Sequence, residues 1–154
     1  MLKVTRRSLA LALLALLVAA LAPAVPAQKS DKENDEPPFH EYKGVRIGML
    51  ADEARQKLGQ PADKGDTQDF YSFSDTETAQ IYYDAEKKVF AISVFYVGAG
   101  SGVPTPKSVL GTDAEPKDDG SMHQRLDFPK ANCWVAYSRT GGDSPLVTVT
   151  LQKK

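Results

Sequence analysis

The sequence contains few of the residues that build covalent or metal-based sites. Its 154 residues include one cysteine, two histidines and one tryptophan. A single cysteine excludes an internal disulfide framework and a structural zinc site built from cysteines. A formal net charge of −1 is unlike the basic stripe of a nucleic-acid-binding protein, so we expect no nucleic-acid partner. The longest apolar run, residues 9–22, is short for a bilayer core of about 30 Å.

The start of the chain, residues 1–27, predicts a secretory signal peptide. Lys3, Arg6 and Arg7 form a positive start, the apolar run follows, and small residues then allow cleavage after Ala27. A retained membrane anchor is the alternative, and the arginine pair also resembles a twin-arginine signal. No cysteine lies near the cleavage site to carry a lipoprotein anchor. We therefore expect a periplasmic or secreted protein with no stable membrane span after cleavage. Its net charge falls from −1 to −4, because cleavage removes three cations and no acidic residue.

A polar segment precedes the folded part of the chain. Residues 28–41 are rich in charged side chains and include a proline pair, which predicts a disordered leader. Order is expected to begin near Phe39 or Tyr42. The rest of the chain, residues 42–154, is long enough to bury a core unaided and predicts a single α+β domain.

The first half of this domain predicts a short helix followed by three strands. Leu50, Ala54 and Leu58 are spaced by four residues and therefore share one helix face, and Gly59 suits the helix end. Three runs rich in β-branched and aromatic residues follow at 69–73, 78–84 and 89–97. Only four residues separate one run from the next, which implies an antiparallel meander.

The same order recurs in the second half. A helix end and three strand-like runs occur at 106–111, 122–128, 133–139 and 146–152. Matching Tyr83 with Tyr137 and Ile92 with Val147 gives a nearly constant spacing between the halves. The pattern predicts two tandem units, each a short helix plus a three-stranded antiparallel meander, with sheets that can be continuous. We place repeat 1 at about 44–97 and repeat 2 at about 103–152. The alternative is a coincidence between two ordinary meanders.

The opening of the first unit resembles a known family. Gly48-Met49, the acidic helix start Asp52-Glu53 and the stop Leu58-Gly59-Gln60-Pro61 resemble the SmpA/OmlA (BamE-like) repeat. Two such units in tandem are similar to the architecture of β-lactamase inhibitor protein. The resemblance implies a binding module of the bacterial envelope or of the extracellular space, with no catalytic residues to transfer. The chain differs from these relatives in lacking a lipidated cysteine and paired cysteines.

The residues offer little that points to catalysis or a cofactor. His40 and His123 lie far apart, and no metal-binding or nucleophile motif is present. The acidic loop at 113–119 is favoured as a solvated surface loop over a weak cation site. Cys133 and His123 fall on adjacent expected strands, but alternation puts Cys133 on the core face and His123 on the other. We therefore expect no catalytic residue, no metal and no cofactor. Cys133 is expected to be buried, with an intermolecular bridge as the alternative.

A binding face is the better candidate for a functional site. In each unit the helix should cover one sheet face and leave the other to solvent. Alternation places Tyr82, Phe95, Arg125 and Trp134 on the open face, and places Phe90 with the covered residues. Tyrosine, tryptophan and arginine are the residue types enriched in interface hot spots. The alternative is that these aromatic side chains fill a seam between the two units.

These observations favour an exported, non-catalytic protein-binding module of the bacterial envelope that uses its open sheet face. The expected partner is another envelope or secreted protein. A structural envelope protein that self-associates through a sheet edge or face is the first alternative, and an enzyme of unknown type is the second.

Overall fold

The computed structural model describes residues 36–154, so the expected signal peptide and residues 28–35 of the leader lie outside the described part. Its elements, in chain order, are β1 (Glu41–Tyr42), β2 (Val45–Arg46), α1 (Ala51–Leu58), β3 (Asp63–Lys64), β4 (Gln68–Ser74), β5 (Glu77–Tyr83), β6 (Val89–Val97), α2 (Pro106–Leu110), β7 (Met122–Phe128), β8 (Cys133–Arg139) and β9 (Leu146–Lys153). Neither helix of this part is long and apolar enough to cross a membrane.

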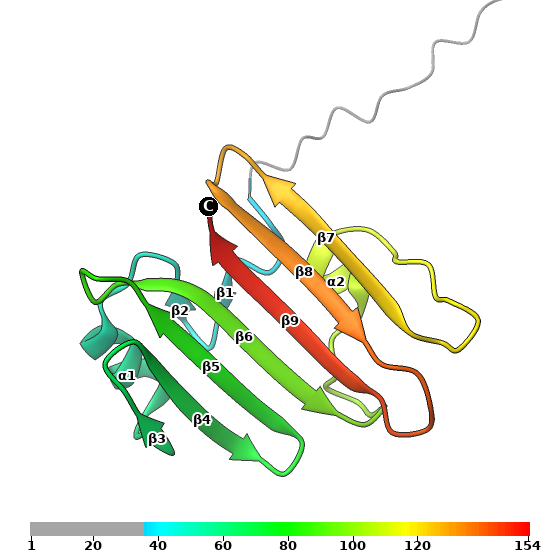
Figure 1. The fold of residues 1–154 in the computed structure, drawn as a ribbon, viewed down its shortest axis with the longest axis horizontal. Helices are drawn as coiled ribbons and strands as arrows, with labels where there is room; N and C mark the ends of the chain where they lie inside the picture. Colours follow the sequence, from blue (N-terminus) through cyan, green and yellow to red (C-terminus); the bar gives the residue numbers. More distant parts are fainter. Residues whose placement is uncertain (1–35) are drawn as a thin grey trace, which may run out of the picture. The chain divides into compact units, whose positions relative to one another are not determined.

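A seven-stranded antiparallel sheet dominates the domain (Figure 1). Its strand order is β3-β4-β5-β6-β9-β8-β7, so the meander β4-β5-β6 and the meander β7-β8-β9 are joined by pairing of their last strands. The α+β class is confirmed, and all six long strands lie where the sequence predicted strand-like runs. The two meanders form one continuous sheet.

One face of the sheet is covered, and the core lies on that face. The β1–β2 hairpin, α1 and α2 lie behind the sheet in Figure 1. Their buried side chains, among them Ala54 and Val109, belong to one cluster with sheet residues such as Ile81 and Ile92. Along β5, β8 and β9 the covered positions alternate with more exposed ones, as the pleat requires, whereas residues 91–94 of β6 are all buried. Cys133 is buried, as expected.

Both helices end where glycine allows a turn. In α1 the Glu53 carboxylate accepts a hydrogen bond from the Leu50 N–H at 3.3 Å, and the Gly59 N–H donates to the Arg55 carbonyl at 2.8 Å. In α2 the Thr105 hydroxyl accepts from the Ser108 N–H at 3.2 Å, which satisfies one free amide of the first turn. The second helix has only five residues, because Pro104 precedes it, Pro106 is its first residue and Gly111 follows it.

The sequence did not predict the β1–β2 hairpin. Lys43 and Gly44 both have positive φ, 48° and 81°, as a two-residue hairpin turn requires. The Tyr42 hydroxyl donates to the Glu77 carboxylate at 2.7 Å, which fastens the hairpin to β5. Lys-Gly is not among the strong turn dipeptides. Before β1, Pro37 is already buried and its carbonyl oxygen lies 3.2 Å from His40 Nδ1, while the Phe39 N–H donates to the Val109 carbonyl at 3.3 Å.

Alternation along β6 predicted that Phe90 lies on the covered face, and this prediction is wrong. Tyr82 pairs with Ala91 and Tyr83 pairs with Val89, so Phe90 is the extra residue of a β-bulge. Its ring lies 6.1 Å from that of Tyr82, which is on the uncovered face. The bulge shifts the alternation by one residue, and a simple period of two cannot anticipate that shift.

The two residue matches proposed between the repeats, Tyr83 with Tyr137 and Ile92 with Val147, are incompatible with each other. Tyr83 pairs with Val89, and Tyr137 pairs with Val149. Matching Tyr83 with Tyr137 therefore matches Val89 with Val149 across the ladders. Matching Ile92 with Val147 along the chain instead assigns Val149 to Val94. The match between β5 and β8 is thus incompatible with the match between β6 and β9.

Ile92→Ala tests the assignment of the two faces. Ile92 is fully buried opposite Leu151, so its truncation should reduce the free energy of unfolding by about 2–5 kcal/mol. The control Thr148→Ala changes the uncovered face of the neighbouring strand β9 and should cost less than about 1 kcal/mol. Urea denaturation followed by circular dichroism measures both. Equal losses would show that the faces are wrongly assigned.

Candidate interaction face

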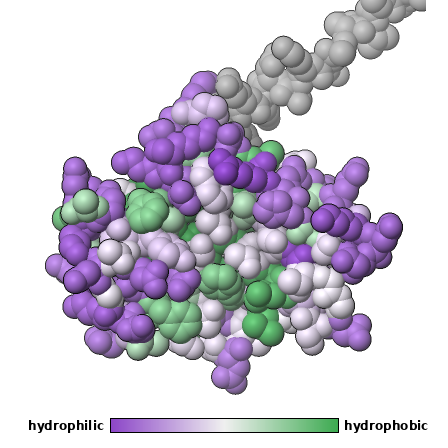
Figure 2. All heavy atoms as spheres, viewed as in Figure 1, coloured by the Kyte–Doolittle hydropathy of each residue, from purple (hydrophilic) through white to green (hydrophobic). Residues whose placement is uncertain are grey.

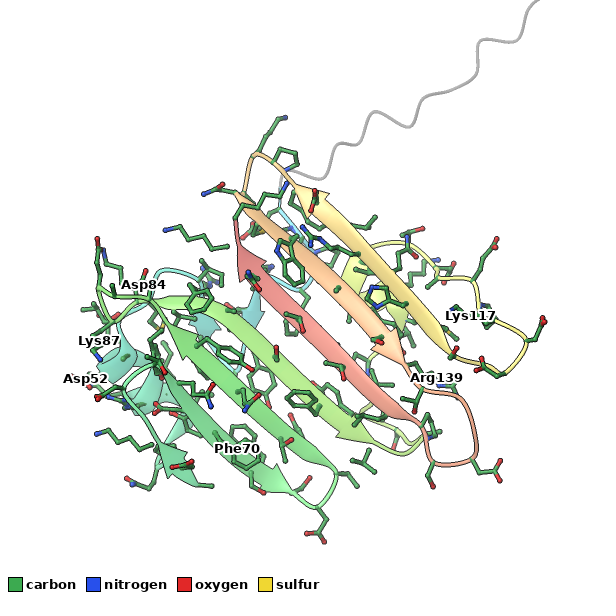
Figure 3. The ribbon with its side chains drawn as sticks, in the orientation of Figure 1. Asp52, Phe70, Asp84, Lys87, Lys117 and Arg139 are labelled. Atoms are coloured by element: carbon green, nitrogen blue, oxygen red, sulfur yellow. The ribbon has the colours of Figure 1, made fainter. Side chains whose placement is uncertain are left out.

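All four residues proposed from the sequence lie on the uncovered face. Tyr82 is opposite Ala91, and Phe95 is opposite Thr148. In the second meander, Trp134 on β8 is opposite Asp127, and Arg125 on β7 is opposite Ala136. Paired residues of neighbouring strands project to the same side of a sheet. Figure 3 shows this face with its side chains, among them Phe70 on β4.

The structure brings Arg125 and Trp134 together. The Arg125 guanidinium carbon lies 4.3 Å from the centre of the Trp134 ring, a cation–π contact. The Asp127 carboxylate lies 3.3 Å from Arg125 Nη2 and 3.0 Å from Lys154 Nζ. One end of the face therefore presents an indole ring flanked by charges of both signs.

Tyr82 belongs to a separate aromatic group. It contacts Phe90 and donates a hydrogen bond of 2.7 Å to the side chain of Gln80. Three strand spacings, about 14 Å, separate β5 from β8 and thus Tyr82 from Trp134. Small and polar side chains lie between them, including Ser93 and Thr150, whose hydroxyl oxygens are 3.2 Å apart.

The seam between the meanders is the β6–β9 pair, and three of the four proposed residues lie away from it. Tyr82 is on β5, Trp134 is on β8 and Arg125 is on β7. Only Phe95 lies on a seam strand, opposite Thr148. A seam-filling role therefore applies to Phe95 alone.

Two exposed apolar residues on this face were missed in the sequence. Val97 and Leu146 are paired at one end of the β6–β9 ladder, with exposed fractions of 49% and 37%. Alternation from Phe95 puts Val97 on the same face, so the signal was present. Figure 2 shows apolar side chains on this face within a surround of hydrophilic ones.

A buried ion pair lies on the opposite side of the sheet, and the sequence did not reveal it either. Asp69 is fully buried. Its carboxylate accepts hydrogen bonds from Arg55 Nε at 2.8 Å, Arg55 Nη2 at 3.2 Å, the Tyr83 hydroxyl at 2.7 Å and the Gly65 N–H at 3.2 Å. The network joins α1, β4, β5 and the turn before β4. Asp69 and Tyr71 are two residues apart on β4 and therefore lie on the same, covered face. This spacing was the sequence signal that could have predicted a buried Asp69.

Hydrogen bonding decides the charge state of this network. Burial alone would raise the pKa of Asp69, but the donors Arg55 and Tyr83 stabilise the carboxylate, and its pKa lies below the ordinary value of 3.8. Burial and the hydrogen bond to Asp69 raise the pKa of Tyr83. At neutral pH the pair is an ionised Asp69 and Arg55 with a neutral tyrosine.

A shallow pocket of about 680 Å³ lies beside this network. Its lining comes from α1, the turn before it, the β3–β4 segment and the β5–β6 turn, and includes Asp52 and Lys87 (Figure 3). Arg55 also lines it, but its guanidinium already donates to Asp69, Asp52 and the Gly65 carbonyl. The pocket therefore presents an already compensated guanidinium among surface charges of mixed sign.

The structure does not assemble the chemical sites considered from the sequence. In residues 36–154, no group of three His, Cys, Asp or Glu side chains is placed to hold a metal ion. His123 is opposite Ser138 on the uncovered face, whereas Cys133 is buried opposite Phe128. The thiol and the imidazole therefore project to different sides of the sheet.

Comparison with known proteins adds no class to this description, because no family model, curated protein or solved structure matches the chain. The class supported by the structure is an α+β domain whose single antiparallel sheet is covered on one side.

Arg55→Met tests the contribution of the buried ion pair. The substitution leaves the buried Asp69 carboxylate without its main partner, and the expected loss is about 3–5 kcal/mol in the free energy of unfolding. The matched control Arg46→Met removes an exposed ion pair with Glu41 on the β1–β2 hairpin and should have a much smaller effect. Urea unfolding compares the two. Similar losses would contradict a structural role for the Arg55–Asp69 pair.

The pH dependence of stability isolates Asp69. Its folded pKa is below its unfolded value, so its contribution is complete above about pH 5 and is lost as pH falls through about 4 to the folded pKa. The stability difference between the wild type and Asp69→Asn should be constant above pH 5. It should then shrink by at most about 1.4 kcal/mol per pH unit. A difference that does not change between pH 7 and pH 3 would contradict the assignment.

Proposed function

We propose that this protein is a non-catalytic protein-binding module of the bacterial envelope that engages another exported protein through its uncovered sheet face. The observation that carries the proposal is a whole sheet face with no covering element among the described residues, bearing partly exposed aromatic and aliphatic side chains. Exposed apolar groups of this kind, bounded by polar ones, mark interaction sites. Trp134 beside Arg125 supplies the residue types that dominate binding energy in interfaces.

The proposed compartment rests on the start of the chain, where a charged segment, an apolar run and a small-residue end support export. In the periplasm or outside the cell the partner is another envelope or secreted protein. The mixed charges around Trp134 suit a protein surface better than a polyanion, since Asp127 lies beside Arg125.

The tandem architecture of the SmpA/OmlA (BamE-like) kind is part of the same proposal. The symmetric strand order, with the last strand of each meander at the centre, supports it. A match that follows the ladders is self-consistent: the cross-strand row Tyr71, Ala79, Val94 then corresponds to the row Leu126, Val135, Leu151. The spacing between matched residues grows slightly from each strand to the next, as small insertions in the turns would produce.

Trp134→Ala and Tyr82→Ala test the binding face. Both variants should keep the far-ultraviolet circular dichroism and melting temperature of a folded protein, while binding of the partner weakens at least tenfold, because hot-spot truncation costs about 2 kcal/mol or more. The measurement is capture of envelope proteins on the immobilised protein, with mass spectrometry of what is retained.

The matched control is Lys107→Ala, which removes an exposed side chain from α2 on the covered side and should leave capture unchanged. If both aromatic variants unfold, these side chains belong to the core and the binding-face proposal fails. Retention of the same proteins by folded variants would equally exclude it.

A further inference from the structure

The two edges of the sheet are unequal. At one edge β3 has only two residues, and such short edge strands discourage pairing with another chain. At the other edge β7 runs for seven residues, Met122–Phe128, without proline, glycine or a bulge. Its inner side pairs with β8, and no strand of residues 36–154 pairs with its outer side. The backbone amides and carbonyls on that outer side are therefore available to a further strand.

Charge at an edge normally protects it, but the charges of β7 are arranged to complement a copy of themselves. Arg125 and Asp127 project to the uncovered face and are both exposed. In an antiparallel pair, residues directly opposite share a face, so a twofold pair of β7 strands must be centred on a residue. Centring on Arg125 puts two guanidinium groups together, and centring on Gln124 puts Arg125 opposite His123 of the second copy.

Only one nearby centre brings opposite charges together. Centring on Leu126 puts Arg125 of each copy opposite Asp127 of the other, which makes two ion pairs across the new ladder. On the covered side the same register puts Leu126 opposite its own copy. That side chain is partly buried at the margin of the core, so a second copy would cover more of its apolar surface.

We propose that the protein forms a twofold dimer in which β7 pairs antiparallel with β7 of a second copy, centred on Leu126, and extends the sheet across both chains. The occupant of the edge is a second copy because the charge pattern of residues 124–128 is self-complementary in one register. The dimer uses the β7 edge and engages Arg125 from the uncovered face, but it leaves Tyr82, Phe95 and Trp134 uncovered, so it does not depend on the proposed partner binding. Either can fail without the other.

Charge reversal tests the register. Arg125→Asp puts two carboxylates opposite two carboxylates, and Asp127→Arg puts two guanidinium groups opposite two guanidinium groups. Each variant alone should raise the dimer dissociation constant at least tenfold in analytical ultracentrifugation. An equimolar mixture of the two should recover a 1:1 heterodimer, because Arg–Asp pairs then form across the ladder. Arg46→Asp, which alters a charge on the β1–β2 hairpin, is the control and should leave the dimer unchanged.

A cysteine pair separates edge pairing from association through the face. Leu126→Cys places two thiols directly opposite, about 4.5–5.5 Å apart between Cβ atoms, close enough to form a disulfide with small adjustments. Mild oxidation with copper phenanthroline should cross-link this variant into dimers. Gln124→Cys, on the same face but away from the twofold centre, should not cross-link. The wild type, whose Cys133 is buried, is the control for cross-linking through the native cysteine.

Any of the following results would overturn the proposal. A wild-type protein that stays monomeric at about 100 μM has no dimer of useful affinity. Dimers that persist in both charge variants, or that fail to reform when the two are mixed, use another surface. Equal cross-linking at positions 124 and 126 would exclude the stated register. Circular dichroism of each variant establishes that it is folded before its oligomeric state is interpreted.

Discussion

The pairing of β6 with β9 is the constraint on which the rest of this structure depends. Seven residue pairs join the two meanders, from Ala91 opposite Gln152 to Val97 opposite Leu146. On the covered side the ladder contributes fully buried valine, isoleucine and leucine side chains from both strands. Without it there would be a four-stranded sheet, β3 to β6, and a three-stranded sheet, β7 to β9, the second covered by a helix of only five residues. A sheet needs a packed hydrophobic face for independent stability, and the shared ladder gives both meanders one core.

The two halves are held to that core differently. In the first half, the Arg55–Asp69–Tyr83 network fastens α1 to β4 and β5, while Tyr42 and Glu77 fasten the hairpin. In the second half, α2 contributes the buried side chains of Val109 and Leu110, and its backbone is held by its caps and by the hydrogen bond from the Phe39 N–H. Polar anchoring with directional hydrogen bonds thus sets the geometry on one side of the seam, and apolar packing sets it on the other.

The strands and their faces were predictable because strongly β-forming runs alternate cleanly, as in Cys133, Val135 and Tyr137 on β8. The failures share a physical cause, which is that a local period carries no information about partners. The position of Phe90 was not predicted because the β-bulge depends on the pairing of β6 with β5. The β1–β2 hairpin was not predicted because strands of two residues show no periodicity. Asp69 is buried only because Arg55 and Tyr83 reach it from other elements. The placement of Tyr82, Phe95, Arg125 and Trp134 on one face followed from alternation, whereas their division into separate groups required the strand order.

The strand order has a consequence for how the chain reaches this structure. The last strand in the sequence, β9, lies in the middle of the sheet, and α2, β7 and β8 all separate it along the chain from its partner β6. Until β9 is in place, the most apolar strand of the protein has a bare edge, and closing such a long loop costs entropy before any contact repays it. Folding is therefore completed when the last strand of the chain, β9, enters the centre of the sheet. A polypeptide that stopped before Leu146 would lose β9 and with it the β6–β9 ladder that joins the two meanders. In a fold whose last strand lies at the edge of the sheet, the same truncation would remove only an edge strand.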